Sequence, residues 1–167
     1  SEDFKSGSNP YGIVTVEFNA RWGDPEAQVI VPGLISNFYQ LGIAVASDDI
    51  SKVELGHDEK VRVVVAGTSR GYPSDSSLIR GKEIKGLDDV LRIEGVRLYG
   101  AGVRRIDGKD YAGGGRLFFI VGEGETVINA REKAYEAMSL VNVEGDNLHF
   151  RTDIGFRDVA RLKQQPS

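Results

Sequence analysis

The chain contains no cysteine, and this absence excludes several kinds of protein at once. Disulfide bonds and cysteine-ligated metal centres are ruled out, and we expect a cytoplasmic protein. No apolar run reaches the length of a membrane span and no signal peptide is visible, so we expect no membrane partner. Acidic residues outnumber lysine and arginine by 25 to 21, which leaves a net charge of −4 and no basic footprint for nucleic acid.

What is present fits a globular chain. Hydrophobic residues make up 40% of the 167 residues and charged residues 28%, a balance that allows a buried core. The length suits one domain or two small ones. Glycine is abundant, at 21 residues, which predicts many tight turns and strands.

The first third of the chain predicts a strand followed by helices. Residues 13–16 are apolar and β-branched, which favours a strand. Helical sequence follows from Pro25, and the Pro-Gly pair at 32–33 is expected to break it. A second helix with a broad apolar stripe is expected over 36–46. The polar segment 47–59 then separates two structural units, and we divide the chain into 1–57 and 58–167.

The second unit predicts a small antiparallel sheet or barrel-like domain that one long helix covers, an α+β arrangement. The helix is expected over 126–141, with Thr126 as its N-cap. Asp107 to Asp110 predict a turn between antiparallel strands. The expected strands are 60–66, 96–104, 116–122 and a short one around His149.

The most informative motif runs from Glu17 to Glu26. Side chains alternate along a strand, so Glu17, Asn19 and Arg21 share one face. Magnesium prefers hard oxygen ligands, which a carboxylate and an amide two residues apart can supply, and the arginine can face a phosphate. Asp24 is expected to cap the helix that begins at Pro25.

Each of these features also has a structural interpretation. A polar strand face before a capped helix is common without any metal. Tyr72 and Pro73 suit a turn as well as a pocket wall. Gly113 to Gly115 favour a tight entry into a strand over a phosphate loop, because no GxxxxGK[ST] pattern is present. Arg151 and Asp153 can form an internal ion pair, and Trp22 is most simply a packing residue.

The whole run resembles the motif of the phosphoribosylamine–glycine ligase family. Trp22 stands where that family has another apolar residue. Further resemblances follow in the same order along the chain. They lie at Val61–Ala66 with Arg70–Pro73, Gly81–Leu87, Gly114–Arg116, Ala130–Ala137 and Arg151–Arg157. One departure is Gly100–Val103, where the family often has His-Ala-Gly-Thr, so that His and Thr have no counterpart here.

The resemblance implies an ATP-grasp ligase of purine biosynthesis, which joins phosphoribosylamine to glycine with ATP as co-substrate and Mg²⁺ or Mn²⁺ as metal. It implies that Glu17 and Asn19 are metal ligands and that Arg21 assists catalysis at the phosphate. It implies that Asp24 and Glu26 lie at the end of the active site that binds glycine or the attacking amine. Tyr72 and Arg151 are implied as substrate-binding residues.

The resemblance also implies a missing partner. The family's N-terminal nucleotide-binding parts have no counterpart before Glu17, so this chain is expected to hold the end of the ATP-grasp domain plus the C-terminal domain. We therefore expect it to be inactive alone. Two alternatives stay open. The chain could be a non-catalytic binding or assembly module derived from such a ligase, or it could come from a sister ATP-grasp ligase or carboxylase.

Overall fold

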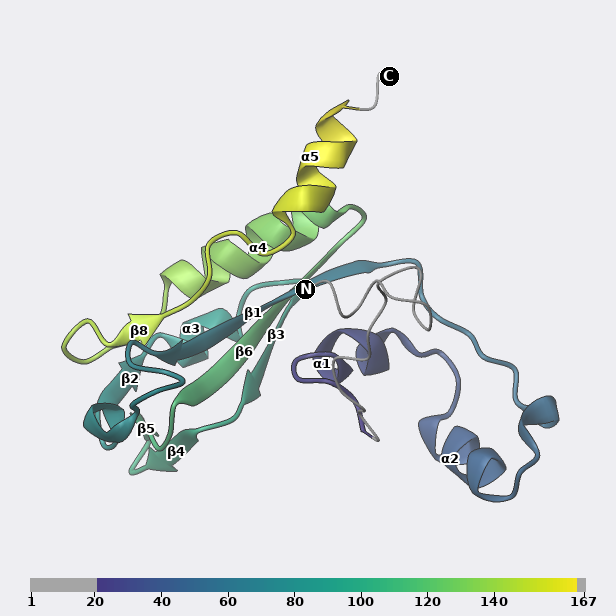
Figure 1. The fold of residues 1–167 in the computed structure, drawn as a ribbon, viewed down its shortest axis with the longest axis horizontal. Coiled ribbons are helices and arrows are strands. Elements are labelled where there is room, and N and C mark those ends of the chain that lie inside the picture. The colour runs from purple at the N-terminus through teal and green to yellow at the C-terminus, as the bar shows by residue number, and fades with distance from the viewer. Residues whose placement is uncertain (1–20, 165–167) are drawn as a thin grey trace, which may run out of the picture.

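The computed structural model describes residues 21–164, which form two antiparallel sheets with helices around them (Figure 1). The first sheet has the strand order β3-β6-β1-β8 and the second the order β4-β5-β2-β7. This mixed architecture confirms the predicted α+β class. The strands of the first sheet are β1 (Val61–Ser69), β3 (Val96–Gly100), β6 (Arg116–Gly124) and β8 (Leu148–His149). Those of the second are β2 (Glu83–Lys85), β4 (Val103–Ile106), β5 (Lys109–Ala112) and β7 (Asn142–Val143).

The main core lies where helix α4 (Val127–Ser139) packs on β1 and β6. Val63 of β1 pairs with Gly122 of β6 beneath this helix. A Cβ added at Gly122 would lie 2.1 Å from the carbonyl oxygen of Ala130, so glycine is what lets the helix come this close. The largest fully buried apolar side chains in the described residues are Phe118, Leu117, Ile120, Met138, Val65, Val90, Val121 and Val143.

Helix α4 begins as predicted. Thr126 has extended backbone angles, and its hydroxyl accepts a hydrogen bond from the backbone N–H of Asn129 at 3.2 Å. This contact satisfies one of the amide groups that a helix start leaves without a partner.

Loss of this cap is expected to destabilise the folded chain. Thr126→Ala should lower the free energy of unfolding by about 1 kcal/mol, because the Asn129 amide loses its acceptor. The measurement is the midpoint of urea unfolding. Thr126→Ser keeps the hydroxyl and is the matched control, so an equal loss in both variants would contradict the capping role.

The expected strand 96–104 is wrong as a single element. Strand β3 ends at Gly100, and β4 starts at Val103 in the other sheet. Between them Gly102 lies so close to β6 that an added Cβ would be 2.5 Å from the Arg116 carbonyl oxygen. The predicted turn is confirmed: Asp107 and Gly108 join β4 to β5, and both have positive φ, as a type I′ hairpin turn requires.

The N-terminal helices partly follow the prediction. Helix α1 (Ala27–Ile30) passes into the 3₁₀ turn η2 (Val31–Gly33), so the break at 32–33 is confirmed. Helix α2 (Phe38–Ala46) starts two residues later than expected, because the Asn37 side chain accepts from the amides of Tyr39 and Gln40. The remaining helical segments are η3 (Ile50–Lys52), η4 (Ser77–Ile79), α3 (Leu87–Val90) and α5 (Phe156–Gln164).

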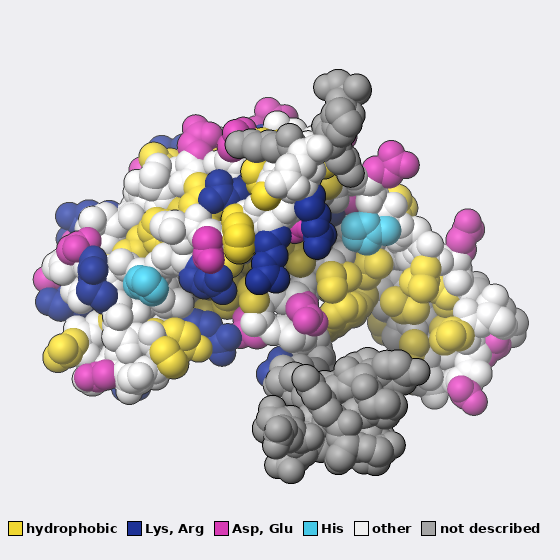
Figure 2. Space-filling model, turned by 45° about the horizontal axis from the view of Figure 1, so that its top comes forward, with side chains coloured by type: hydrophobic (Ala, Val, Ile, Leu, Met, Phe, Trp, Pro, Cys, Tyr) yellow, Lys and Arg dark blue, Asp and Glu magenta, His cyan; other side chains and the backbone are white. Residues whose placement is uncertain are grey.

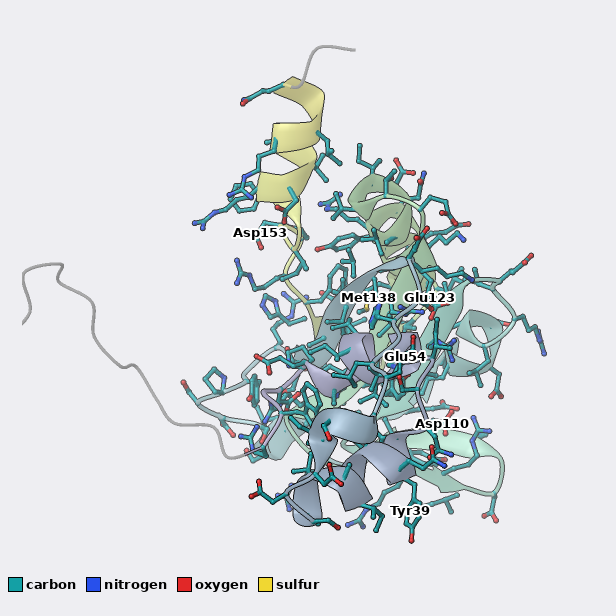
Figure 3. The ribbon with its side chains drawn as sticks, turned by 90° about the vertical axis from the view of Figure 1, so that its right-hand side faces the viewer. Tyr39, Glu54, Asp110, Glu123, Met138 and Asp153 are labelled. Atoms are coloured by element: carbon teal, nitrogen blue, oxygen red, sulfur yellow. The ribbon has the colours of Figure 1, made fainter. Side chains whose placement is uncertain are left out.

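Apolar side chains of the N-terminal region are exposed. Helix α1 contacts β1 and β6, whereas α2 lies farther from the sheets (Figure 1). Yellow apolar side chains accordingly gather over α2 in Figure 2, and Tyr39 points away from the rest of the molecule in Figure 3. Trp22, expected to be a core or packing residue, is 44% exposed and therefore does not lie in the core.

A buried charge network ties residue 58 to the first sheet. The guanidinium of Arg62, only 3% exposed, donates to both carboxylate oxygens of Asp58 at 2.7 and 2.5 Å. It also donates to Glu123 at 3.0 Å, and Arg97 donates to the same oxygen at 2.6 Å. Hydrogen bonding from Arg62 lowers the pKa of Asp58 to about 2. The pKa of Glu123 is lowered too, because its bonds to Arg97 and Arg62 outweigh the opposing effect of burial.

The network predicts sensitivity to acid. Both carboxylates bind protons more weakly in the folded chain, so their contribution to stability is complete above about pH 5 and is lost as the pH falls toward about 2. Urea midpoints measured from pH 7 to pH 3 should fall, and the fall should be shallower in the double variant Asp58→Asn, Glu123→Gln. Equal slopes in variant and parent would contradict this assignment.

None of the helices between residues 21 and 164 has the length and apolar character needed to cross a membrane.

Candidate functional site

The segment that carries the motif is joined to the second unit by an ion pair. Gly23 to Glu26 form a turn in which the Glu26 amide donates to the Gly23 carbonyl oxygen at 2.9 Å. The carboxylate of Asp24 leaves this turn and pairs with the guanidinium of Arg116, the first residue of β6. The expectation that Asp24 caps a helix is therefore wrong: α1 begins at Ala27, its N-cap position is Glu26, and no side chain caps it.

Arg116 also contacts an aromatic ring. Its guanidinium carbon lies 5.8 Å from the centroid of the Tyr72 ring, within the range of a cation–π contact. A Cβ added at Gly115 would be 2.5 Å from Cδ2 of Tyr72, so this glycine makes room for the ring beside the strand entry. Asp24, Arg116 and Tyr72 thus form one cluster drawn from three distant parts of the sequence.

Tyr72 also lines a pocket of about 240 Å³ together with Arg151. Pairing of β1 with β8 brings these two residues together, because Thr68 lies opposite His149 and donates to its carbonyl oxygen at 3.0 Å. The lining combines apolar side chains with a phenol, an imidazole and a guanidinium. A mostly apolar lining with a few polar groups is typical of small-molecule sites.

The Arg151 side chain holds Asp153 in a two-bond ion pair, with distances of 2.9 and 2.8 Å. This pairing lowers the pKa of Asp153 and raises that of Arg151. Helix α4 fixes the same segment, since Tyr135 donates to the Arg151 carbonyl oxygen and Arg131 to those of Thr152 and Ile154. Figure 3 shows Asp153 beside the start of α5. The ion pair between Arg151 and Asp153 is thus present, and the Arg151 side chain remains 68% exposed at the pocket.

Of the other predicted site residues, the described ones, Arg21 and Glu26, have local contacts only. Glu17 and Asn19 lie outside the described residues. Arg21 donates to the carbonyl oxygen of Trp22 at 2.5 Å, and the Glu26 carboxylate accepts from the Gly23 amide at 2.8 Å. Within residues 21–164 no group of three His, Cys, Asp or Glu side chains is arranged to hold a metal ion.

Three residues of this region were not selected as site residues from the sequence: Arg116, Thr68 and His149. The Gly-Gly-Arg block contained a usable signal for Arg116, since an arginine directly after glycines at a strand entry can reach a neighbouring segment. Lys and Arg side chains do gather over the middle of the face shown in Figure 2. Nothing in the sequence pairs Thr68 with His149, because their contact depends on strand register.

Residues 60–157 match the family model described as "Phosphoribosylglycinamide synthetase, C domain". The chain belongs to this family. Known relatives agree with the match. The phosphoribosylamine–glycine ligase of Caldanaerobacter subterraneus is 37% identical over 143 residues, which are 86% of this chain and 33% of that protein. The trifunctional purine biosynthetic protein adenosine-3 of Gallus gallus is 34% identical over 154 residues, 92% of this chain and 15% of that protein.

A solved structure of the same family has a similar fold. The crystal structure of phosphoribosylamine–glycine ligase from Thermotoga maritima superposes with a TM-score of 0.60 at 35% identity, covering 80% of this chain and 32% of that chain. The chain spans about a third of the length of the bacterial ligases that it matches. It therefore corresponds to a C-terminal portion of such an enzyme, and the resemblance found in the motifs is confirmed.

Proposed function

We propose that this chain is the C-terminal part of an ATP-grasp ligase that joins phosphoribosylamine and glycine to give glycinamide ribonucleotide, in the cytoplasm. The ion pair between Asp24 and Arg116 is the observation that supports this most, because it connects the motif segment to the matched C domain. The division after residue 57 remains a prediction.

The residues of this chain would mainly position reactants. Asp24 and Glu26 would lie near glycine or the attacking amine, and Tyr72 with Arg151 would hold part of a substrate in the pocket that they share. Arg21 would assist at the phosphate. Glu17 and Asn19 offer the oxygen donors that Mg²⁺ favours, and the ion would neutralise phosphate charge of ATP.

The exposed apolar side chains of α2 support a role as part of a larger enzyme. Phe38, Tyr39, Ile43 and Val45 of this helix are between 51% and 76% exposed. Exposed apolar patches mark interaction surfaces, and the partner proposed here is the remaining two thirds of the ligase. On this account the chain does not catalyse ligation alone.

Growth complementation tests the proposal. A bacterial host that lacks phosphoribosylamine–glycine ligase should not grow without purine when it expresses this chain alone. It should grow when the chain is joined to the first two thirds of the Caldanaerobacter enzyme, whose own last third is the matched control. Growth with that control but not with this chain would favour a non-catalytic module.

A further inference from the structure

A pocket of about 470 Å³ lies on the second sheet, outside the cluster of Asp24, Arg116 and Tyr72. Arg104 and Ile106 of β4 form one wall, and Tyr111 of β5 lies directly opposite Arg104 in the strand register. Arg80, from the segment before β2, also lines the pocket. Its volume falls within the range of small-molecule sites, roughly 300 to 1,000 Å³.

The two arginines of this pocket are exceptional in the described part of the chain. Neither the Arg80 nor the Arg104 side chain has a hydrogen bond, an ion pair or a ring contact. Every other arginine in residues 21–164 holds a carboxylate, a backbone carbonyl oxygen or an aromatic ring. In an acidic chain whose other guanidiniums have partners, two free ones in a single pocket indicate an anionic ligand.

No carboxylate lines the pocket. On the other face of the hairpin, Arg105 forms ion pairs with the carboxylates of Asp88 and Asp110. Asp110 is labelled in Figure 3. Glu83 lies on the same face of the sheet as Tyr111, with which it pairs in the register. Its carboxylate lies 3.6 Å from the Lys85 ammonium and 3.9 Å from that of Lys109, so these two cations offset its charge.

The rest of the lining suits a planar ring. Tyr111 is half-buried, and Ile106 exposes an apolar side chain beside it. Gly81 has nothing within 4 Å of where a Cβ would lie, and an added Cβ at Gly113 would come 3.6 Å from Nε of Arg104. Because these two glycines have no side chains, they leave space inside the pocket. Tyr111 offers an aromatic face of the kind on which nucleic-acid bases stack.

We propose that this pocket binds a nucleoside monophosphate, with Arg80 and Arg104 on the phosphate and Tyr111 against the base. The site is distinct from the cluster at Arg116 and does not depend on the proposed ligase activity. Binding is expected in the chain as it stands and should weaken with salt, because two charge-assisted contacts hold the phosphate.

Calorimetric titration of the 167-residue chain with AMP, adenosine and inorganic phosphate tests this site. AMP should bind with one-to-one stoichiometry, and adenosine and phosphate should each bind at least about tenfold more weakly. Arg80→Gln and Arg104→Gln should each weaken AMP about tenfold. Arg92→Gln, which removes an exposed arginine outside the pocket, is the control and should change nothing.

The variant Tyr111→Ala distinguishes recognition of the base from recognition of the phosphate. It should reduce AMP affinity to that of inorganic phosphate and leave phosphate binding unchanged. Absence of saturable AMP binding would overturn the site, as would an equal loss in Arg92→Gln. AMP binding no tighter than phosphate in the parent chain would overturn recognition of the base.

Discussion

Replacement of Arg62 by methionine is expected to lower the free energy of unfolding by about 3 kcal/mol, the low end of values for breaking a buried ion pair. The variant keeps an apolar stem but leaves the Glu123 carboxylate, 8% exposed, with Arg97 as its remaining cation. Asp58 loses both of its side-chain hydrogen bonds to β1. The midpoint of thermal unfolding should fall by about 6–12 °C.

A matched control distinguishes burial from charge. Arg70 donates to Asp146 at 2.6 Å, but both side chains of that pair are exposed. Arg70→Met should therefore cost less than about 1 kcal/mol. Similar losses in the two variants would show that burial of Arg62 does not set the energy.

Replacement of Arg116 by alanine is expected to lower turnover of the complete ligase by about a hundredfold, the cost of a displacement of reacting groups by about 1 Å. The guanidinium is the contact that Asp24 and Tyr72 share, so its loss frees both proposed substrate-binding residues. Arg116→Lys keeps the charge but not the planar fork, and it should recover part of the rate.

The readout for Arg116 is kcat/KM for ADP release, with the unfolding midpoint as a parallel measurement. The Arg116 side chain is partly exposed, so its removal should cost less than about 1 kcal/mol of stability. Turnover within threefold of the parent would exclude a positioning role. A large loss of stability would instead show that the pair with Asp24 is mainly structural.

The sequence predicted those helices and strands that depend on the residue pattern within a single segment. The helical spacing after Thr126 predicted α4, and alternating or continuous apolar runs predicted β1 and β6. The predicted strand 96–104 failed because apolar residues continue on both sides of Gly100 to Gly102, where the chain crosses to the second sheet. A single sequence does not show which strands pair across such a crossing.

In the candidate site, too, the contacts between distant segments could not be predicted from the sequence. Asp24 has the chemistry of an N-cap, but a guanidinium far along the chain takes its carboxylate instead. Tyr72 and Arg151 were selected from the family resemblance, and only the register of β1 with β8 explains why they share a pocket. Arg80 and Arg104 carried no motif. Their proposed role rests on side chains that have no partner, which a sequence does not reveal.

The central proposal is that this chain completes a phosphoribosylamine–glycine ligase. The most direct test is ADP release from ATP by purified protein in the presence of Mg²⁺, glycine and phosphoribosylamine. We expect no glycine-dependent release from the chain alone, and release at a ligase rate once the remaining two thirds of the enzyme is supplied. Turnover by the isolated chain at that rate, or no turnover when a relative's own C-terminal third restores it, would contradict the account.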